Sequence, residues 1–210
     1  MSLERSTYAT WKDIKRATLQ RLFVVEGGTV VVSDLTKPYI ELMPAAANEG
    51  MYLLASAGGV GVKALSFQKK RADGNCSRFD MNKYAHDFRS FTDEVYIQTD
   101  KGRERLYGYV TEAASVLVLP AWIEGEITVY YNPLPQYISQ YISDDEEIKL
   151  LPMASTLLPL YIASQLFKDD DMRLAVQLRN EFEAGLARMS SLISSDRKNK
   201  ESFASVTGWC

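Results

Sequence analysis

The chain has 210 residues, of which 46% are hydrophobic and 24% are charged, and its formal net charge at pH 7 is −3. This length suffices for one large domain or two small ones, and the composition is that of an ordinary soluble globular protein. The acidic balance gives the surface as a whole no broad attraction for nucleic acid or for an anionic membrane.

The two cysteines, Cys76 and Cys210, form neither a disulfide framework nor a zinc pattern, and they fit a reducing compartment. The N-terminal sequence MSLERSTYATWKDIKR lacks the apolar run of a signal peptide, and no segment has the length of a membrane span. We therefore expect a protein made in a bacterial cytoplasm, with no membrane partner.

Capping residues and apolar periodicity predict two N-terminal helices. Thr10 is the expected N-cap of a helix over residues 11–23. A glycine pair and a short β-branched run follow at residues 27–32. A second helix is expected to start at Thr36-Lys37-Pro38, because proline is tolerated in the first helical turn. Its small residues would let another helix approach closely, and Pro44 should bend it.

The middle of the chain changes to the two-residue period of strands. Short runs rich in β-branched and aromatic residues are separated by turn residues such as Asp73-Gly74-Asn75. They predict a small antiparallel β-domain, either a sandwich or a partly open barrel. The expected strands are residues 62–69, 94–98, 105–110, 115–119 and 126–131.

Helices are predicted to return after the turn at residues 132–135. Ser143-Asp-Asp-Glu146 has the spacing of a capping box, and Pro152 is the expected start of the main helix. Asp169–Asp171 are expected to cap a last helix that ends near Ile193. Acidic residues at helix starts are stabilised by the helix dipole. This explains both acidic runs better than a calcium loop, whose turn glycine is absent.

These elements predict an α+β fold in which a helical core of about four helices carries an inserted antiparallel β-domain. Two helices come from the N-terminal part and two from the C-terminal part. The expected boundaries are 1–60 for the first helices, 61–135 for the β-domain, 136–193 for the last helices, and 194–210 for a polar C-terminal tail.

Patterns that suggest catalysis or cofactor binding have simpler structural interpretations. Gly59-Val60-Gly61-Val62-Lys63-Ala64 matches a dinucleotide fingerprint, but that motif needs a strand before it and a helix after it. Here the order is reversed, which favours a glycine helix stop and hinge. His86 lies near Asp87 and Ser90, so a hydrolase is a third hypothesis. No nucleophile elbow is present, and we expect His86 on a surface turn, no metal site and no cofactor.

The aromatic and basic residues of the β-domain allow two interpretations. Trp122 and several tyrosines would line a carbohydrate or peptide groove, although alternating aromatics in short strands are more often a sheet core. Arg103 and Arg105, on a predicted hairpin, would meet phosphates if the molecule lined a DNA passage.

The C-terminal part of the chain has a recognisable succession of motifs: Ile127-Thr-Val-Tyr-Tyr131, the acidic capped start, Leu157–Ala163, Leu166–Asp170 and Phe182–Ala187. This pattern resembles structural proteins of tailed bacteriophages and prophages. More narrowly, it is similar to the head–tail connector, or adaptor, proteins that form a ring below the portal. The N-terminal helix with residues 34–56 is similar to the opening helix pair of these proteins.

The resemblance implies a non-enzymatic virion protein that forms a homo-oligomeric ring of about a dozen subunits. It also implies a portal protein and a tail-completion protein as partners, and double-stranded DNA that passes through without sequence-specific binding. Leu157, Leu174 and Leu192 lie off the main helical stripes, and with Trp209 they are the candidate interface residues; Arg103 and Arg105 are the candidate DNA-channel contacts. The alternative function is a β-domain binding module for carbohydrate or peptide, such as a tail, baseplate or receptor-binding component.

Overall fold

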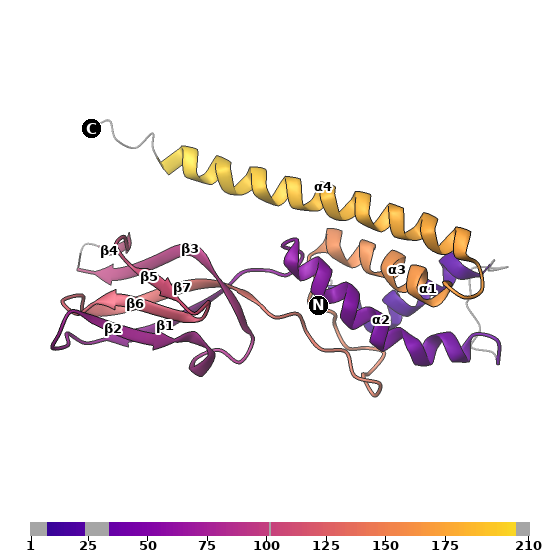
Figure 1. Cartoon of the computed structure of the whole chain (residues 1–210), viewed down its shortest axis with the longest axis horizontal. Helices are drawn as coiled ribbons and strands as arrows, with labels where there is room; N and C mark the ends of the chain where they lie inside the picture. The colour runs from indigo at the N-terminus through magenta and orange to yellow at the C-terminus, as the bar shows by residue number, and fades with distance from the viewer. Residues whose placement is uncertain (1–7, 24–33, 101, 205–210) are drawn as a thin grey trace, which may run out of the picture. The chain divides into compact units, whose positions relative to one another are not determined.

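The computed structural model describes residues 8–23, 34–100 and 102–204, with side chains described up to residue 195. These residues form four α-helices and antiparallel sheets, which confirms the predicted α+β fold. The chain divides into two compact units: a helical unit, Met1–Val60 with Pro135–Cys210, and a β-unit, Gly61–Leu134. The helical unit therefore combines both ends of the chain, and the β-unit is inserted between them in sequence (Figure 1).

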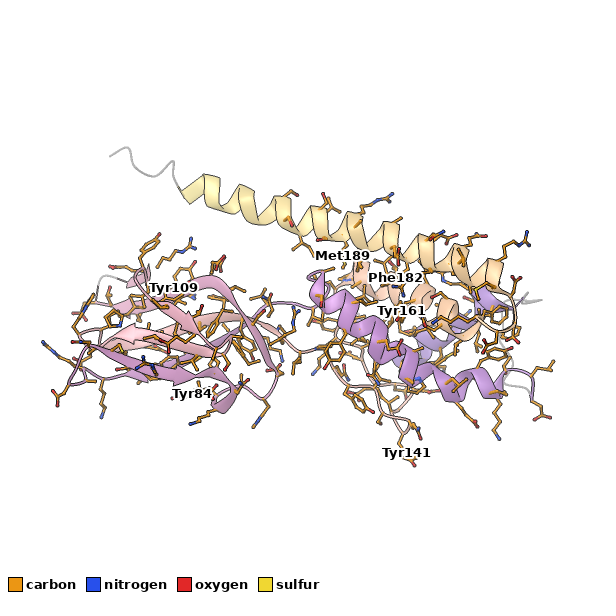
Figure 2. The ribbon with its side chains drawn as sticks, viewed as in Figure 1. Tyr84, Tyr109, Tyr141, Tyr161, Phe182 and Met189 are labelled. Carbon is orange, nitrogen blue, oxygen red and sulfur yellow. The ribbon has the colours of Figure 1, made fainter. Side chains whose placement is uncertain are left out.

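Helix α3 (Pro152–Leu166) is the centre of the helical unit. It buries nine residues, from Ala154 to Ser164, so it has no solvent-facing stripe. The other three helices pack against it: α1 (Trp11–Leu22), α2 (Lys37–Ser56) and α4 (Met172–Ala204). Tyr161 of α3 meets Phe182 of α4 edge to face, with ring centroids 5.1 Å apart (Figure 2). Each fully buried side chain of this size contributes roughly 1.5–3 kcal/mol of transfer free energy.

The predicted caps at Thr10 and Asp171 are confirmed. Asp13 N donates to Thr10 Oγ1 (3.2 Å) and Thr10 N donates to Asp13 Oδ2 (3.0 Å), which is a complete capping box. These hydrogen bonds from Thr10 hold the pKa of Asp13 below its usual value. At the start of α4, Leu174 N donates to Asp171 Oδ1 (3.0 Å). The aspartate run is therefore a helix cap at a corner.

The helix start predicted at Ser143–Glu146 is wrong. The segment makes only a turn, in which Glu146 N donates to Ser143 O (3.1 Å), and residues 144–151 contain no helix. Ile148 and Leu150 are instead fully buried in the helical core. The segment's carbonyls accept from the first turn of α1, whose N–H groups lack partners within the helix: Trp11 N donates to Glu146 O (2.8 Å) and Lys12 N donates to Asp144 O (2.9 Å). In the opposite direction, Ile148 N donates to Ala9 O (2.9 Å).

Residues 194–204 also differ from the prediction, because they continue α4 and do not begin a separate polar tail. No glycine or proline stands between Gly185 and Gly208, so nothing in the sequence stops the helix there. The predicted glycine stop at residues 27–28, the β-branched run at 29–32 and Trp209 lie outside the described residues.

The β-unit is built from two antiparallel sheets that share one core. One sheet has the order β1 (Lys63–Lys69), β7 (Gly125–Pro133), β3 (Phe88–Thr99), β4 (Gly102–Arg105), and the other β2 (Cys76–Asp80), β6 (Val116–Pro120), β5 (Val110–Glu112). Val95 and Val129 from the first sheet join Leu117 and Leu119 from the second in a single buried cluster. The arrangement is a small sandwich (Figure 1).

Two features of the β-unit differ from the sequence prediction. Strand β2 is absent from the predicted set, and the run predicted at 105–110 divides, because β4 ends at Arg105 and β5 starts at Val110. The turn between β5 and β6 uses Ala113 and Ala114, with φ of 47° and 60°. Such a turn ordinarily uses Asn-Gly, so the sequence carries no ordinary turn signal there.

The glycine pattern after α2 acts as a helix stop. Gly58 has φ of 86°, a conformation that glycine adopts without strain. A Cβ on Gly59 would lie 2.8 Å from Ala154 Cβ, so this position has no room for a side chain. Strand β1 follows, and no helix starts there. The order of helix, glycines and strand agrees with the predicted helix stop, and it is the reverse of the order that a dinucleotide fingerprint needs.

Candidate functional site

Helix α4 carries apolar side chains on both flanks of its buried stripe. The stripe consists of Ala175, Leu178, Phe182 and Met189. Since a helix turns about 100° per residue, Met172 and Val176 fall on one flank, and Leu174 and Leu192 on the other. Met172 is 63% exposed, Val176 49% and Leu192 52%. Leu174 is half-buried against the core. Large apolar side chains exposed on two flanks of one helix suit protein contacts.

The candidate interface residues differ in their exposure to solvent. Leu192 is exposed and Leu174 is partly exposed, as a surface role requires. Leu157 is 8% exposed, and its Cδ2 lies only 2.3 Å from the place that a Cβ on Gly185 would occupy. Leu157 is therefore a core residue between α3 and α4, and its assignment to a subunit interface is wrong. Trp209 lies outside the described residues.

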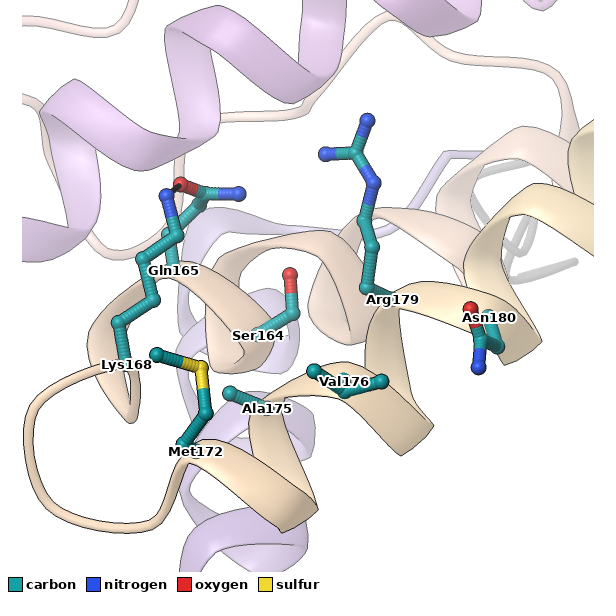
Figure 3. A pocket seen from close by; sticks show the side chains of 8 residues that line it. All are labelled: Ser164, Gln165, Lys168, Met172, Ala175, Val176, Arg179 and Asn180. Carbon is teal, nitrogen blue, oxygen red and sulfur yellow. Dashed lines mark hydrogen bonds between the residues drawn. The ribbon is translucent and has the colours of Figure 1, made fainter.

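A groove of about 270 Å³ opens where α3 ends and α4 begins. Met172, Ala175 and Val176 of α4 line it with apolar groups, and Gln165 and Lys168 face them from the end of α3 (Figure 3). Ser164, Asn180 and Arg179 complete the lining. The Arg179 guanidinium lies 4.9 Å from the ring centroid of Tyr161, and its Nε donates to Glu183 Oε1 (2.7 Å). The groove thus combines an apolar floor with the ammonium of Lys168 and a guanidinium that is paired with Glu183.

The candidate DNA contacts, Arg103 and Arg105, lie on one face of edge strand β4, opposite Gln98 and Tyr96 of β3. The Arg103 guanidinium lies 4.4 Å from the Tyr96 ring centroid, and its Nη2 donates to Tyr130 Oη (2.8 Å). Arg105 Nη2 donates to the backbone oxygen of Asp93 (2.8 Å). Both arginines are thus held by the sheet. Glu126 of β7 pairs with Gln98 on the same face, so the face is of mixed charge.

Trp122 is the most unusual exposed residue of the β-unit. It is 70% exposed, whereas its neighbours Ala121 and Ile123 are 4% and 2% exposed. The ammonium of Lys69, a residue only 2% exposed, donates to Ile123 O (2.6 Å), Ala121 O (3.1 Å) and Lys70 O (3.3 Å). A buried lysine must satisfy its three donors, and here backbone carbonyls on both sides of Trp122 do so. The turn that presents Trp122 is therefore fixed.

The predicted tyrosine groove is not a single surface. Tyr131 is buried in the core of the β-unit, where Asp87 accepts its hydrogen bond (2.9 Å), whereas Tyr107 is 76% exposed. Burial and this hydrogen bond raise the pKa of Tyr131 to about 12. Tyr137 and Tyr141 are exposed too, but they belong to the helical unit.

The residues of the hydrolase hypothesis are not joined as a triad. His86 is exposed on a turn, as predicted. Burial alone would raise the pKa of Asp87, but hydrogen bonds from Lys63 (2.5 Å) and Tyr131 (2.9 Å) outweigh it and lower that pKa. Ser90 Oγ accepts from Asn132 Nδ2 (3.1 Å). The Asp87 carboxylate is thus committed to Lys63 and Tyr131.

Within the described ranges, no cluster of three or more His, Cys, Asp or Glu side chains is placed to hold a metal ion. None of the described helices is long and apolar enough to cross a membrane. No protein-family model matches the chain, and no curated protein matches it either. The surfaces that stand out are the α4 flanks with their groove, the Trp122 turn and the β4 face.

Proposed function

We propose that this chain is a structural protein of a tailed phage or prophage virion, namely a head–tail connector whose copies form a ring between portal and tail. The observation that carries the proposal is the set of apolar side chains on two flanks of α4: exposed Met172 and Val176 on one, and exposed Leu192 with half-buried Leu174 on the other. A closed ring requires two different patches on each subunit, because each subunit contacts two neighbours through unlike surfaces.

The apolar residues of α4 and the net charge of the chain are compatible with this role. A stable interface buries about 1,600 Å² in total, so the apolar residues of α4 would form its centre and polar side chains its rim. The net charge of −3 suits a channel through which DNA slides without sticking. Arg103 and Arg105 are proposed to contact passing phosphates from the β4 face.

The test is the oligomeric state of the full chain, measured by sedimentation velocity and electron microscopy over a wide range of concentration. It is carried out with the chain alone and with a portal protein encoded in the same genome. We expect discrete rings of uniform subunit number. Val176→Asp and Leu192→Asp should each prevent ring formation, because each places a charge in an apolar contact.

Ser191→Asp is the matched control, because Ser191 is exposed on the face of α4 opposite the buried stripe and its substitution should leave the rings intact. A chain that remains strictly monomeric at all concentrations and ignores the portal would contradict the proposal. Portal, capsid and tail-completion genes beside this one would support it.

The exposed Trp122 favours a second function, a carbohydrate- or peptide-binding module in the β-unit. A rigid exposed aromatic side chain is a common platform for a sugar ring or an apolar peptide side chain. Binding on a glycan or peptide array that is lost in Trp122→Ala, from a chain that forms no rings, would favour this function over the connector.

A further inference from the structure

The Trp122 turn is built to hold a large apolar side chain in solvent. Trp122 is 70% exposed although both neighbouring side chains are buried. The Lys69 ammonium fixes the turn by hydrogen bonds to Ala121 O and Ile123 O, and Ala121 N donates to Asn75 O (3.1 Å). A fixed turn loses little conformational entropy when its side chain enters a partner. Tryptophan is one of the residue types enriched among the hot spots near the centre of interfaces.

The groove between α3 and α4 has the size and chemistry to receive one aromatic side chain. Its volume of about 270 Å³ is below the roughly 300–1,000 Å³ of small-molecule sites. Ala175 and Val176 offer an apolar floor, and Lys168 brings positive charge to the lining, whereas the Arg179 guanidinium is paired with Glu183. Cations interact more favourably with the face of an indole than with any other side-chain ring.

We propose that Trp122 of one copy of this chain inserts into the α3–α4 groove of a neighbouring copy. This inference deepens the connector function and rests on it. The projecting tryptophan lies in the β-unit and the groove lies in the helical unit, so the contact joins unlike patches, as a ring requires. Charge favours the same pairing: exposed Glu124 follows Trp122 by two residues, and exposed Lys168 lines the groove of the neighbouring copy.

The direct test is disulfide formation between two different chains that lack the native cysteines (Cys76→Ser, Cys210→Ser). One chain carries Glu124→Cys and the other carries Lys168→Cys, two exposed positions that the proposal brings together while Trp122 is kept. A disulfide requires Cα atoms about 4.4–6.8 Å apart, so we expect a covalent dimer in the mixture and not in either chain alone. Replacing the second partner by a Ser191→Cys chain should give no dimer.

A second test keeps the native surface and follows fluorescence. In a Trp209→Phe chain the emission comes from Trp11, which is 3% exposed, and from Trp122. Quenching by acrylamide therefore reports on Trp122. We expect quenching to fall severalfold when the chain assembles, and Trp122→Ala to weaken self-association about 30-fold, the size of a hot-spot loss.

The outcomes separate this inference from the function on which it rests. Rings in which Trp122 stays as quenchable as in the monomer, or rings of unchanged stability in Trp122→Ala, would overturn the inference and leave the connector function standing. A glycan that protects Trp122 in the monomer would overturn it in favour of a binding module. A third sample, one chain that carries both introduced cysteines, gives a further outcome. A disulfide that forms within this chain and never between two chains would also overturn the inference. Absence of any assembly would overturn both proposals.

Discussion

Gly185→Ala sets helix propensity against packing, and the structure indicates which effect is larger. Alanine is favoured over glycine inside a helix by about 0.8–1.0 kcal/mol. A methyl group at position 185 would, however, lie 2.3 Å from Leu157 Cδ2 and 3.3 Å from Leu157 Cδ1. Leu157 is 8% exposed and has little room to turn away. Overpacking of this kind costs about 1–3 kcal/mol.

Because the contact is so short, we expect the upper half of that range, and therefore a net loss of about 1–2 kcal/mol after the propensity gain. For a chain of this size the melting temperature should fall by about 2–8 °C. Urea unfolding of the full chain, followed by far-UV circular dichroism, measures the free energy of unfolding. Ala184→Gly is the matched control, because Ala184 is exposed on the same turn of α4 and reports propensity alone.

A double-substitution cycle tests the cause. Leu157→Ala alone leaves a cavity and should cost about 2–5 kcal/mol. With both Gly185→Ala and Leu157→Ala, the loss should be smaller than the sum of the single losses by 1 kcal/mol or more. If Gly185→Ala instead stabilises the protein by as much as Ala184→Gly destabilises it, then α3 and α4 are not in close contact at this point, and the reasoning is refuted.

Three further predictions concern the β-unit and are measured on the full chain. Lys69→Met should lower the free energy of unfolding by about 2–3 kcal/mol by removing charge-assisted hydrogen bonds, while Lys70→Met, at an exposed position, should change it by less than about 0.5 kcal/mol. Equal effects would contradict the role of Lys69 in fixing the Trp122 turn. Ala114→Gly should raise the urea midpoint by relieving a positive φ, a gain of about 0.5–1 kcal/mol, and a lower midpoint would contradict it. The raised pKa of Tyr131, about 12, contributes stability that is complete below about pH 10 and is lost as pH rises through 12. Tyr131→Phe should therefore lose less stability than the native chain between pH 9 and 11.5, and parallel losses would argue against the buried bond to Asp87.

Local signals in the sequence predicted local structure well. Thr10 and Asp171 each need only neighbouring backbone N–H groups to act as caps, so their roles follow from the residues beside them. Ser143–Glu146 has comparable spacing but makes only a turn. Ile148 and Leu150 alternate with polar residues after it, and their burial in the helical core holds the chain extended. Tertiary packing overrides the capping signal there.

The candidate sites depended on contacts that no short stretch of sequence contains. Leu157 was expected on a surface because it lies off the main stripe, but every residue of α3 from Leu157 to Ser164 is buried, so this part of the helix has no free flank. Lys69 and Ile123 are 54 positions apart, and neither position alone indicates that together they hold Trp122 in solvent. The groove likewise needs the corner between α3 and α4. Among the candidate interface residues, the exposure of Leu192 and the partial exposure of Leu174 followed from helical periodicity.

The β-unit is attached through two adjacent strands. Lys63 near the start of β1 pairs directly with Tyr131 near the end of β7, so the chain enters and leaves this unit side by side. A short loop would close the helical unit if the whole insertion were removed, and the entropy of closing a loop rises only slowly with its length. Recombination at these two crossing points therefore gives a lineage a simple way to exchange or enlarge the β-unit while the helical fold is inherited unchanged.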